Sequence, residues 1–553
     1  MVQLGLSAFY HDSAACLLID GKVLAAVEEE RFTGIKHDNS FPFNSINWCL
    51  SYAEKNIGDI NQVCWYENPE TKKDRVLKIF KKRPIRTFLK KRKFLKEFET
   101  SSNPAKILRS IGYTGEIKYT DHHLSHAAFS YYTSPFEEAA ILTIDGVGEW
   151  ETLTISYAKG DIIEKKFHLN FPNSLGMLYS TITAYLGFKP NEGEYKVMGL
   201  APYGDPAKYY DKINKIFKDD DIKQKYFAWE YSDKTMFTSR LSNLLKLAPR
   251  HPEDPLTQDH KDLASALQKI YENKFMKYLK IAKNLTGSTN ICLAGGCAYN
   301  GVANNKANII FKKVFIPFAP SDAGSAIGSC LHQYTGYKRS PVSPFLGPEY
   351  NDSTEILKLI KDSNLKHILF QDEALFPKIA DLIASGKIIA WFQGRMEFGA
   401  RALGNRSILA TPRDPKMREK LNYVIKKREG FRPFAPSVLY EDVNKWFLFK
   451  NEVPYMNLVV RTVGYDKTPP TVYLPSATHI DNTARIHTVT EQQNPRYYKL
   501  LQELKKLTGF GVVLNTSFNL KDETITMAPQ QAIERFCNSE IDYLVINNFL
   551  IIK

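Results

Sequence analysis

With 553 residues, the chain is too long for one compact hydrophobic core, so we expect two or more domains. Its composition, 43% apolar and 24% charged, is typical of a folded globular protein and excludes the disordered and fibrous classes. The net charge of +14 favours anionic partners such as nucleotides, phosphates, nucleic acid or an acidic membrane face.

The sequence also bears on the compartment. His11 and Asp12 interrupt the early apolar run, so we expect no signal peptide, and no apolar stretch approaches the length of a bilayer span. The seven cysteines are scattered, with no C-x-x-C pair, which favours reduced thiols over disulfides or a structural zinc site. We therefore expect a cytoplasmic protein without membrane insertion.

An internal repeat runs through the first third of the chain. Strands are predicted at 4–9, 14–19 and 22–27, and the same order of strand, polar turn, strand, tight turn and strand returns between residues 139 and 167. Such a repeat predicts two related half-domains whose polar turns face each other across a cleft. Backbone N–H groups of these turns, at Gly146 and Gly148, are candidates for holding phosphate.

Much of the excess positive charge lies in residues 72–96, where phenylalanines interleave with lysines and arginines. This pattern predicts short amphipathic helices. A solvated helical face is the favoured interpretation, a basic rim around an anionic substrate comes second, and specific nucleic-acid binding comes third because no recognised motif accompanies the segment.

Residues 121–126 contain three histidines, of which His122 and His126 stand four positions apart. On a helix both imidazoles would lie on one face, the spacing by which a helix offers two ligands to one metal ion. Asp145 and Asp322 each follow a predicted strand, at 139–144 and 315–318, and would supply carboxylates. Ordinary surface or core histidines remain the alternative, because this spacing also arises by chance.

The middle of the chain alternates loops, helices and strands. Glycines and a proline predict a loop over 191–203, and apolar periodicity predicts a helix over 258–283. A buried strand at 290–293 opens into a glycine pair. Gly295, Gly296 and the following Asn300 are candidates for contacting a nucleotide, although tight helix–strand packing explains the glycines equally well.

Prolines between residues 339 and 348 predict a linker, which gives a first domain over 1–338, a linker over 339–350 and a second domain over 351–553. In the second domain we expect a helix at 373–385 and a strand at 387–392.

Arginines and lysines gather among glycines and aromatics at 394–407 and 426–436, and Arg485 follows. A strand at 511–514 is expected to open into a polar turn at 515–519. Each arginine alone is explained by a surface ion pair, but the ensemble favours a pocket for a polyanion.

The motifs at 121–128, 194–201, 401–409 and 431–436 resemble, in this order, the O-carbamoyltransferase family of nodulation protein U and of enzymes that modify tobramycin, cephamycin and novobiocin-type antibiotics. The resemblance covers nearly the whole chain. It implies an α/β protein with a duplicated N-terminal domain of the actin-like ATPase (ASKHA) type and a smaller C-terminal α/β domain similar to threonylcarbamoyl-adenylate synthases (YrdC-like).

By this resemblance, iron would bind His122, His126 and Asp322, with Asp145 close by as a further ligand, although such ligands also suit zinc or manganese. His11 would be the proton acceptor and Lys36 would contact the nucleotide. The residues that would grip carbamoyl phosphate and ATP are Arg401, Lys426, Arg432, Arg485, Asn515 and Ser517.

The implied reaction has two steps. ATP, accompanied by Mg²⁺, would convert carbamoyl phosphate into carbamoyl adenylate, and the carbamoyl group would then pass to a hydroxyl of a small-molecule acceptor. The alternatives are a tRNA threonylcarbamoyl transferase and a non-enzymatic actin-like nucleotide switch. Nucleic acid is not expected as a partner, an oligomer is compatible with the sequence, and the acceptor is not legible in it.

Overall fold

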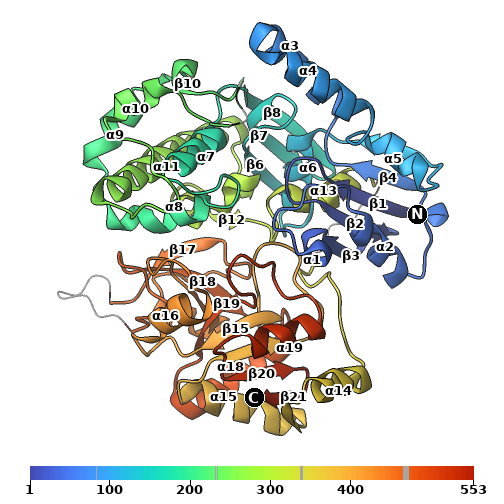
Figure 1. Cartoon of the computed structure of the whole chain (residues 1–553), viewed down its shortest axis with the longest axis vertical. Coiled ribbons are helices and arrows are strands. Elements are labelled where there is room, and N and C mark those ends of the chain that lie inside the picture. Colours follow the sequence, from blue (N-terminus) through green and yellow to red (C-terminus); the bar gives the residue numbers. More distant parts are fainter. Residues whose placement is uncertain (83, 231, 233, 335, 337–340, 465–472) are drawn as a thin grey trace. The chain divides into compact units, whose positions relative to one another are not determined.

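The computed structural model describes residues 1–82, 84–230, 232, 234–334, 336, 341–464 and 473–553, without the side chains of 84–86. They form two compact units (Figure 1): unit 1 is Met1–Glu29 with His37–Val342, and unit 2 is Glu30–Lys36 with Ser343–Lys553. Both units mix helices and strands, which confirms the α/β class. Residues 338–340, where the first predicted domain ends and the linker begins, lie outside the described residues.

Unit 1 contains two five-stranded sheets. The first has the order β3-β2-β1-β4-β5 and comprises β1 (Val2–Ser7), β2 (Ala14–Ile19), β3 (Lys22–Glu28), β4 (Gln62–Trp65) and β5 (Glu116–Tyr119). The second has the order β12-β11-β6-β7-β8 and comprises β6 (Glu138–Ile144), β7 (Glu151–Lys159), β8 (Ile162–Asn170), β11 (Asn290–Ala294) and β12 (Lys313–Phe315). A separate ribbon pairs β9 (Phe217–Lys218) with β10 (Asp221–Ile222).

The two five-stranded sheets share one topology. In each, the first strand pairs antiparallel with the second strand of a three-stranded meander, and two later strands add in parallel on its other side. The tight turns of the meanders use left-handed backbone, as at Gly21 (φ 79°) and Gly160 (φ 59°). The predicted internal repeat is therefore confirmed in strand order and direction.

Two helices connect the sheets of unit 1. Helix α6 (His122–Tyr132) packs on β6 and β11, α13 (Asp322–Gln333) packs on β1 and β2, and the two helices pack on each other. Their approach is close because α13 is rich in small residues: a Cβ at Gly328 would lie 2.0 Å from the Ser125 carbonyl oxygen. This packing brings the first turns of both helices beside the end of β6.

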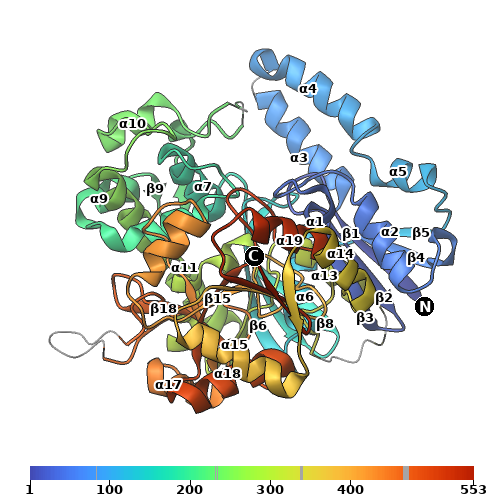
Figure 2. The same ribbon diagram turned by 60° about the horizontal axis from the view of Figure 1, so that its bottom comes forward.

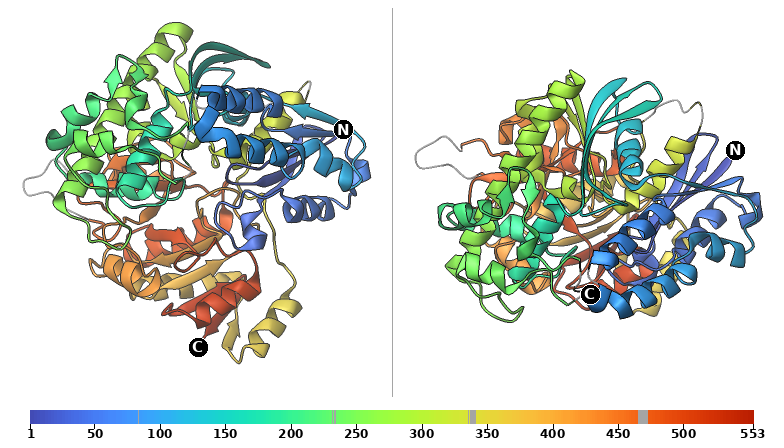
Figure 3. Two further views of the ribbon diagram at one scale, coloured as in Figure 1. Left: turned by 45° about the horizontal axis from the view of Figure 1, so that its top comes forward. Right: turned by 90° about the horizontal axis from the view of Figure 1, so that it is seen from above.

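The remaining helices of unit 1 flank these layers, and those of residues 175–286 gather beside the second sheet (Figure 3). Their bounds are α2 (Phe43–Tyr52), α3 (Pro69–Lys82), α4 (Pro84–Glu99), α5 (Pro104–Ser110), α7 (Leu175–Tyr185), α8 (Glu194–Leu200), α9 (Ala207–Asn214), α10 (Ser239–Leu245), α11 (Gln258–Thr286) and α12 (Gly301–Asn304). Among the described residues, no helix is long and apolar enough to cross a membrane. All seven cysteines are described and remain free thiols.

Two predictions about unit 1 are wrong in detail. The predicted loop at 191–203 contains α8 and a 3₁₀ turn at Ala201–Tyr203. The strand expected at 315–318 ends at Phe315, so Asp322 begins a helix instead of following a strand directly. In α8, burial of Val197, Met198 and Leu200 outweighs the weak helix propensity of the neighbouring glycines.

Unit 2 is built on a nine-stranded mixed sheet with the order β13-β21-β20-β14-β15-β19-β16-β18-β17. The strands are β13 (Lys366–Leu369), β14 (Ile389–Phe392), β15 (Arg406–Ala410), β16 (Ala435–Leu439), β17 (Leu458–Arg461), β18 (Thr483–Val489), β19 (Val512–Ser517), β20 (Tyr543–Ile546) and β21 (Phe549–Ile552). The helices are α1 (Glu30–Thr33), α14 (Ser353–Asp362), α15 (Asp372–Ala384), α16 (Met417–Glu419), α17 (Val443–Trp446), α18 (Pro495–Thr508) and α19 (Pro529–Cys537), with a π-helix at Lys420–Ile425.

Helices cover both faces of this sheet. Alternation along β14 sends Ala390 and Phe392 toward α14 and α19, and Ile389 and Trp391 toward α15 and α18. The predicted helix at 373–385 and strand at 387–392 correspond to α15 and β14 with small shifts. The polar turn expected to start at Asn515 is wrong, because β19 continues through Ser517.

Candidate functional site

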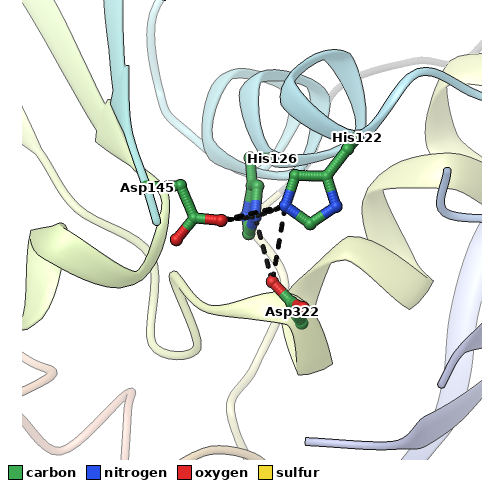
Figure 4. Close-up of side chains that lie close together, drawn as sticks. All are labelled: His122, His126, Asp145 and Asp322. Carbon is green, nitrogen blue, oxygen red and sulfur yellow. Dashed lines mark hydrogen bonds and ion pairs between the residues drawn. The ribbon is translucent and has the colours of Figure 1, made fainter. Parts of the chain in front are cut away.

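Four side chains that were predicted as metal ligands come together in unit 1 (Figure 4). His122 and His126 lie one turn apart on α6, Asp145 directly follows β6, and Asp322 is the first residue of α13. One ligand atom from each lies within 4.8 Å of the other three. We call this group the His–Asp cluster.

The geometry of the His–Asp cluster fits a divalent cation. The Nε2 atoms of His122 and His126 lie 3.1 Å apart, and Asp322 Oδ1 lies 3.6 Å and 3.3 Å from them. Asp322 is fully buried, and within the described chain neither of its carboxylate oxygens has a hydrogen-bond partner. A buried charge left in this way is unfavourable, and a metal ion bound by two imidazoles and two carboxylates removes the cost.

Neighbouring groups hold these ligands in place. Ser325 Oγ lies 3.0 Å from Nδ1 of His126, so the Nε2 atom of that ring faces the cluster. The Gly296 amide donates to Asp145 Oδ1 (3.1 Å), while Asp145 Oδ2 lies 3.0 Å from His122 Nε2. Glu149 accepts the His122 amide (3.0 Å) and thereby fixes the first turn of α6.

Electrostatics within the cluster reflect the close charges. Burial acts to lower the pKa of His122, but Asp322 and Asp145 outweigh it and raise the pKa to about 9. Burial acts to raise the pKa of Asp145, but its hydrogen bond with His122 and the charge of His126 hold it well below the usual range. The third histidine of the motif, His123, points to Thr154 Oγ1 (3.3 Å), and burial lowers its pKa well below the usual range.

His11 lies on the turn after β1 and reaches the same cluster, with Nε2 4.0 Å from Asp322 Oδ2. Its Nδ1 lies 3.1 Å from one oxygen of Asp12, whose other oxygen lies 2.6 Å from His37 Nδ1. Burial acts to lower the pKa of His11, but Asp322 and Asp12 raise it to about 10. Asp12 thus links two imidazoles from different parts of unit 1.

The glycines predicted to hold phosphate have packing roles around this cluster. A Cβ at Gly148 would lie 3.0 Å from the His122 side chain, and one at Gly295 (φ 83°) would lie 2.3 Å from the Ile144 carbonyl oxygen. The Gly146 carbonyl accepts the Ser174 hydroxyl (2.6 Å). Their contact with a nucleotide remains a prediction.

Asn300 also has structural partners. Its side chain caps α12 by accepting the Ala303 amide (3.1 Å), and it exchanges hydrogen bonds with Gln268 of α11 (3.0 Å and 3.2 Å). A role in nucleotide binding is a prediction for this residue as well.

Unit 2 contains a dense group of cations around Lys426. Its ammonium donates to the Ser517 and Asn519 carbonyl oxygens (2.5 Å and 2.8 Å) and to Asn519 Oδ1 (2.8 Å), and the residue is 4% exposed. Burial first, and then the charges of Arg428, Arg432, Lys36 and Arg535, lower its pKa well below the usual range. We call these five cations the basic cluster.

Carboxylates lie beside two cations of the basic cluster. Arg432 lies 3.6 Å from Glu429, and Arg535 lies 2.7 Å from Glu523. Lys426 is held by uncharged oxygens, and Arg428 donates to Asn422 Oδ1 (2.8 Å). Burial and the other four cations lower the pKa of Lys426, so an anionic ligand would offset their charge and favour the protonated ammonium.

Two further cations, Arg401 in the loop before β15 and Arg485 on β18, belong to unit 2. Burial and the charge of Arg401 lower the pKa of Arg485, on β18, well below its usual range.

Asn515 is 1% exposed and donates to the Ala402 carbonyl oxygen (3.2 Å) and to Ser437 Oγ (3.1 Å). Ser517 donates to Asn519 Oδ1 (2.7 Å), which in turn accepts from Lys426.

One arginine of the 394–407 segment has a structural role. Arg406 is fully buried and donates to four carbonyl oxygens, those of Gln393, Asn405, Pro348 and Gly394, at 2.6–3.2 Å. Its guanidinium also lies 3.6 Å from the centre of the Phe392 ring. Arg406 therefore organises the loop through Nη1 and Nη2, which are already engaged within the protein.

Several supporting residues were missed from the sequence. Ser325 and Glu149 lie inside motifs that drew attention for other residues, and Arg428 lies between two predicted cations, so a local signal existed for each. Arg535 joins the basic cluster from outside those motifs, and Asn519, the last residue of the predicted polar turn, accepts a hydrogen bond from Lys426. Their positions depend on how α19 and the end of β19 fold, which spacing does not reveal.

Comparison with known proteins matches both units to the same family. The family model described as Carbamoyltransferase N-terminus matches residues 2–331, and that described as Carbamoyltransferase C-terminus matches residues 380–553. A protein of Synechocystis sp. described as uncharacterized is 40% identical over all of this chain and 96% of its own length. Nodulation protein NolNO of Sinorhizobium fredii is 36% identical over 99% of this chain and 80% of that protein.

A relative described by its enzymatic activity also matches. The 3'-hydroxymethylcephem-O-carbamoyltransferase of Amycolatopsis lactamdurans is 31% identical over 59% of each chain. Among solved structures, HypF of T. kodakarensis matches 60% of this chain and 47% of its own at 12% identity, with a TM-score of 0.32, too low to define a shared fold. The family models cover most of both units, and the chain belongs to the carbamoyltransferase family of enzymes.

Proposed function

We propose that the protein is an ATP-dependent O-carbamoyltransferase, in which unit 2 makes carbamoyl adenylate from carbamoyl phosphate and ATP and unit 1 transfers the carbamoyl group to a hydroxyl. The observation that carries this proposal is the presence of two different sites in one carbamoyltransferase chain. One is the basic cluster, suited to polyanions, and the other is the His–Asp cluster with a histidine beside it.

The activation step is assigned to unit 2. Water cleaves carbamoyl phosphate into carbamate and inorganic phosphate. An oxygen of the carbamate then attacks the α-phosphorus of ATP, pyrophosphate leaves, and carbamoyl adenylate forms. Both substrates are polyanions that repel each other, so fixed cations are needed to bring them together. Lys36, Lys426 and Arg432 supply such charges in the basic cluster, and Arg401 and Arg485 supply two more. Mg²⁺ is expected with ATP.

Pre-organisation supports this assignment. Asn519 and the backbone of β19 fix the Lys426 ammonium through three hydrogen bonds, so its position does not depend on a ligand. Asn515 and Ser517 hold the same strand through their own hydrogen bonds. These two residues therefore act on the substrates either directly or by positioning the cations.

The transfer step is assigned to unit 1. The acceptor hydroxyl attacks the carbamoyl carbon, AMP leaves, and His11 takes the hydroxyl proton. A base must be neutral, whereas the carboxylates around His11 raise its pKa to about 10. A divalent cation bound at the His–Asp cluster would offset the charge of Asp145 and Asp322, polarise the reacting centre and neutralise the phosphate of the adenylate. Asp12 orients the His11 ring through Nδ1.

The identities of the metal and the folds are part of the proposal. We infer iron(II) at His122, His126, Asp145 and Asp322 from the family resemblance, although zinc and manganese suit the same donors. The repeated meander with two added parallel strands supports an actin-like ATPase fold for unit 1. The mixed sheet of unit 2 is compatible with a YrdC-like domain, which the family resemblance implies.

The acceptor is proposed as a hydroxyl of a small molecule such as a natural product or a sugar. The relative from Amycolatopsis lactamdurans is described as an O-carbamoyltransferase, which supports oxygen as the accepting atom. Family membership favours this reading over threonylcarbamoyl transfer to tRNA, and it sets aside the non-enzymatic switch.

The test separates the two steps. The full-length enzyme is expected to release pyrophosphate only when ATP and carbamoyl phosphate are both present, and Arg432→Ala is expected to abolish this release. Arg413→Ala, at an exposed arginine outside the basic cluster, serves as the matched control. Pyrophosphate release that survives in Arg432→Ala would remove the activation site from unit 2.

His11→Asn is expected to release pyrophosphate normally but to lose carbamoyl transfer. Mass spectrometry of hydroxylated acceptors supplied with ATP, carbamoyl phosphate and ferrous iron measures the gain of one carbamoyl group. Undiminished transfer by His11→Asn would exclude His11 as the proton acceptor.

A further inference from the structure

Nearly all of the chain's excess positive charge lies in one helical hairpin. Residues 72–96 contain thirteen lysines and arginines and one aspartate, a net charge of +12 out of +14 for the whole chain. This segment spans α3 and α4, which run side by side and extend from the first sheet of unit 1 (Figures 1 and 2). It lies outside the His–Asp cluster and belongs to a different unit from Lys426.

The inner face of α4 packs on α3. The rings of Phe80 and Phe94 are centred 6.1 Å apart, those of Phe94 and Phe98 are 5.9 Å apart, and Thr87 is 1% exposed. The Thr87 hydroxyl donates to the Phe80 carbonyl oxygen (3.0 Å). Residues 87, 94 and 98 follow helical spacing, so the opposite face of α4 points away from α3.

That opposite face combines apolar and cationic side chains. Phe88 is 66% exposed and Leu89 is 77% exposed, which makes Leu89 the most exposed large apolar side chain among the described residues. Arg92, Lys93 and Lys96 follow on the same face within the next two turns and are exposed as well. Adjacent large apolar residues beside several cations are typical of helices that lie in a lipid interface.

We propose that this face of α4, formed by Phe88, Leu89, Arg92, Lys93 and Lys96, docks the protein on the surface of an anionic lipid bilayer. The cations pair with lipid phosphates, and the two apolar side chains enter the boundary between headgroups and acyl chains. Phosphates of a nucleic acid would attract the same cations, but they offer no apolar layer for Leu89. The exposed leucine therefore favours lipid over nucleic acid.

Binding is tested by co-sedimentation of the full-length protein with vesicles of phosphatidylcholine, with or without phosphatidylglycerol, at low and high salt. The protein is expected to bind the phosphatidylglycerol vesicles and to lose binding as salt rises. Phe88→Ser with Leu89→Ser is expected to weaken binding by at least about tenfold, because the apolar contact is removed while every charge remains. Arg92→Glu, Lys93→Glu and Lys96→Glu together are expected to weaken it by more than about a hundredfold.

Matched controls change equally exposed residues elsewhere in unit 1. Ile162→Ser with Ile309→Ser, at side chains 72% and 73% exposed, and Lys269→Glu with Lys280→Glu and Lys312→Glu are expected to bind as the wild type does. The thermal midpoint of each variant is measured to establish that it is folded.

Three outcomes would overturn the proposal: no binding to phosphatidylglycerol vesicles, equal binding after the Phe88 and Leu89 changes, or equal loss in the control variants. A fourth is binding of duplex DNA or tRNA in a co-sedimentation or gel-shift assay without any binding to vesicles. That result would assign the face to nucleic acid.

Discussion

The Nε2 atoms of His122 and His126 face each other across 3.1 Å, beside a fully buried Asp322. Unless a cation or a proton lies between them, the nitrogen lone pairs of the two rings and the Asp322 carboxylate would repel one another. The structure therefore supplies a site whose energetic requirement is met by a metal, and the adjacent His123 supplies an internal control for it.

We predict that His122→Gln lowers the metal content per chain by at least about tenfold, since even changes outside the ligand set cost 10- to 100-fold in affinity. His123→Gln is expected to keep the metal, because its ring points to Thr154. Elemental analysis by mass spectrometry after purification with added ferrous iron measures both. Equal metal in the two variants would contradict the assignment.

Asp12→Asn is predicted to alter the transfer step alone. Removing this charge takes away one of the three carboxylates that raise the pKa of His11, so the pKa falls. The lower-pH limb of the carbamoyl-transfer profile should move down by about one pH unit, and the maximal rate should fall because the His11 ring loses its partner. Pyrophosphate release should keep its wild-type profile. An unchanged pH profile for transfer would show that Asp12 does not act through His11.

Two arginines of unit 2 are predicted to differ in kind. Arg406→Met leaves four buried carbonyl oxygens without their donor, at about 1–3 kcal/mol for each unsatisfied group, so local stability should fall by at least about 3 kcal/mol. Arg432→Ala breaks a half-exposed contact with Glu429, worth less than about 1 kcal/mol. Hydrogen exchange of the β14 and β15 amides measures this contrast, and similar exchange in both variants would refute it.

His487 is predicted to make unit 2 sensitive to acid. Burial lowers its pKa to about 3, whereas in the unfolded chain the value is near 6.5. The unfolded state therefore binds the proton first, and the stability from this residue is complete above about pH 6.5 and lost as the pH falls toward 3. Between pH 6.5 and 4.5 the loss should be roughly 2–3 kcal/mol.

Urea unfolding at several pH values measures this effect. His487→Gln, which cannot take up the proton, should show a decline that is smaller than that of the wild type by the stated amount. Parallel declines in the two proteins would exclude His487 as the acid-sensitive group.

The sequence predicted the features that depend on local periodicity. The strand pattern before Asp20 and again after Asp145 was enough to indicate a duplication, because strands and tight turns each leave a short-range signal. The four side chains of the His–Asp cluster were also singled out as metal ligands, since helical spacing joins His122 to His126, and the structure brings them together. The grouping of Asp322 with these two histidines came from the family resemblance. Its position at the start of α13, instead of at a strand end, was not foreseen.

Other features depend on tertiary contacts that no local pattern carries. Helix α8 forms around glycines because its apolar residues are buried by the surrounding structure. Arg406 could not be distinguished from its neighbours, since only the folded loop shows which guanidinium is satisfied by carbonyl oxygens. Arg535 reaches Lys426 from a helix about one hundred residues later in the chain.

The segment Glu30–Lys36 interrupts unit 1 and belongs to unit 2, where the Arg31 guanidinium donates to the Gly399 carbonyl oxygen (2.9 Å) and Lys36 joins the basic cluster. The polypeptide therefore passes from one unit to the other three times. A plasmid that encodes only residues 343–553 would omit Arg31 and Lys36. One that ends at residue 342 would produce the segment 30–36 without the rest of unit 2, with which it packs. Dissection of the two half-reactions therefore calls for point variants in the intact polypeptide, because severed halves would each be incomplete.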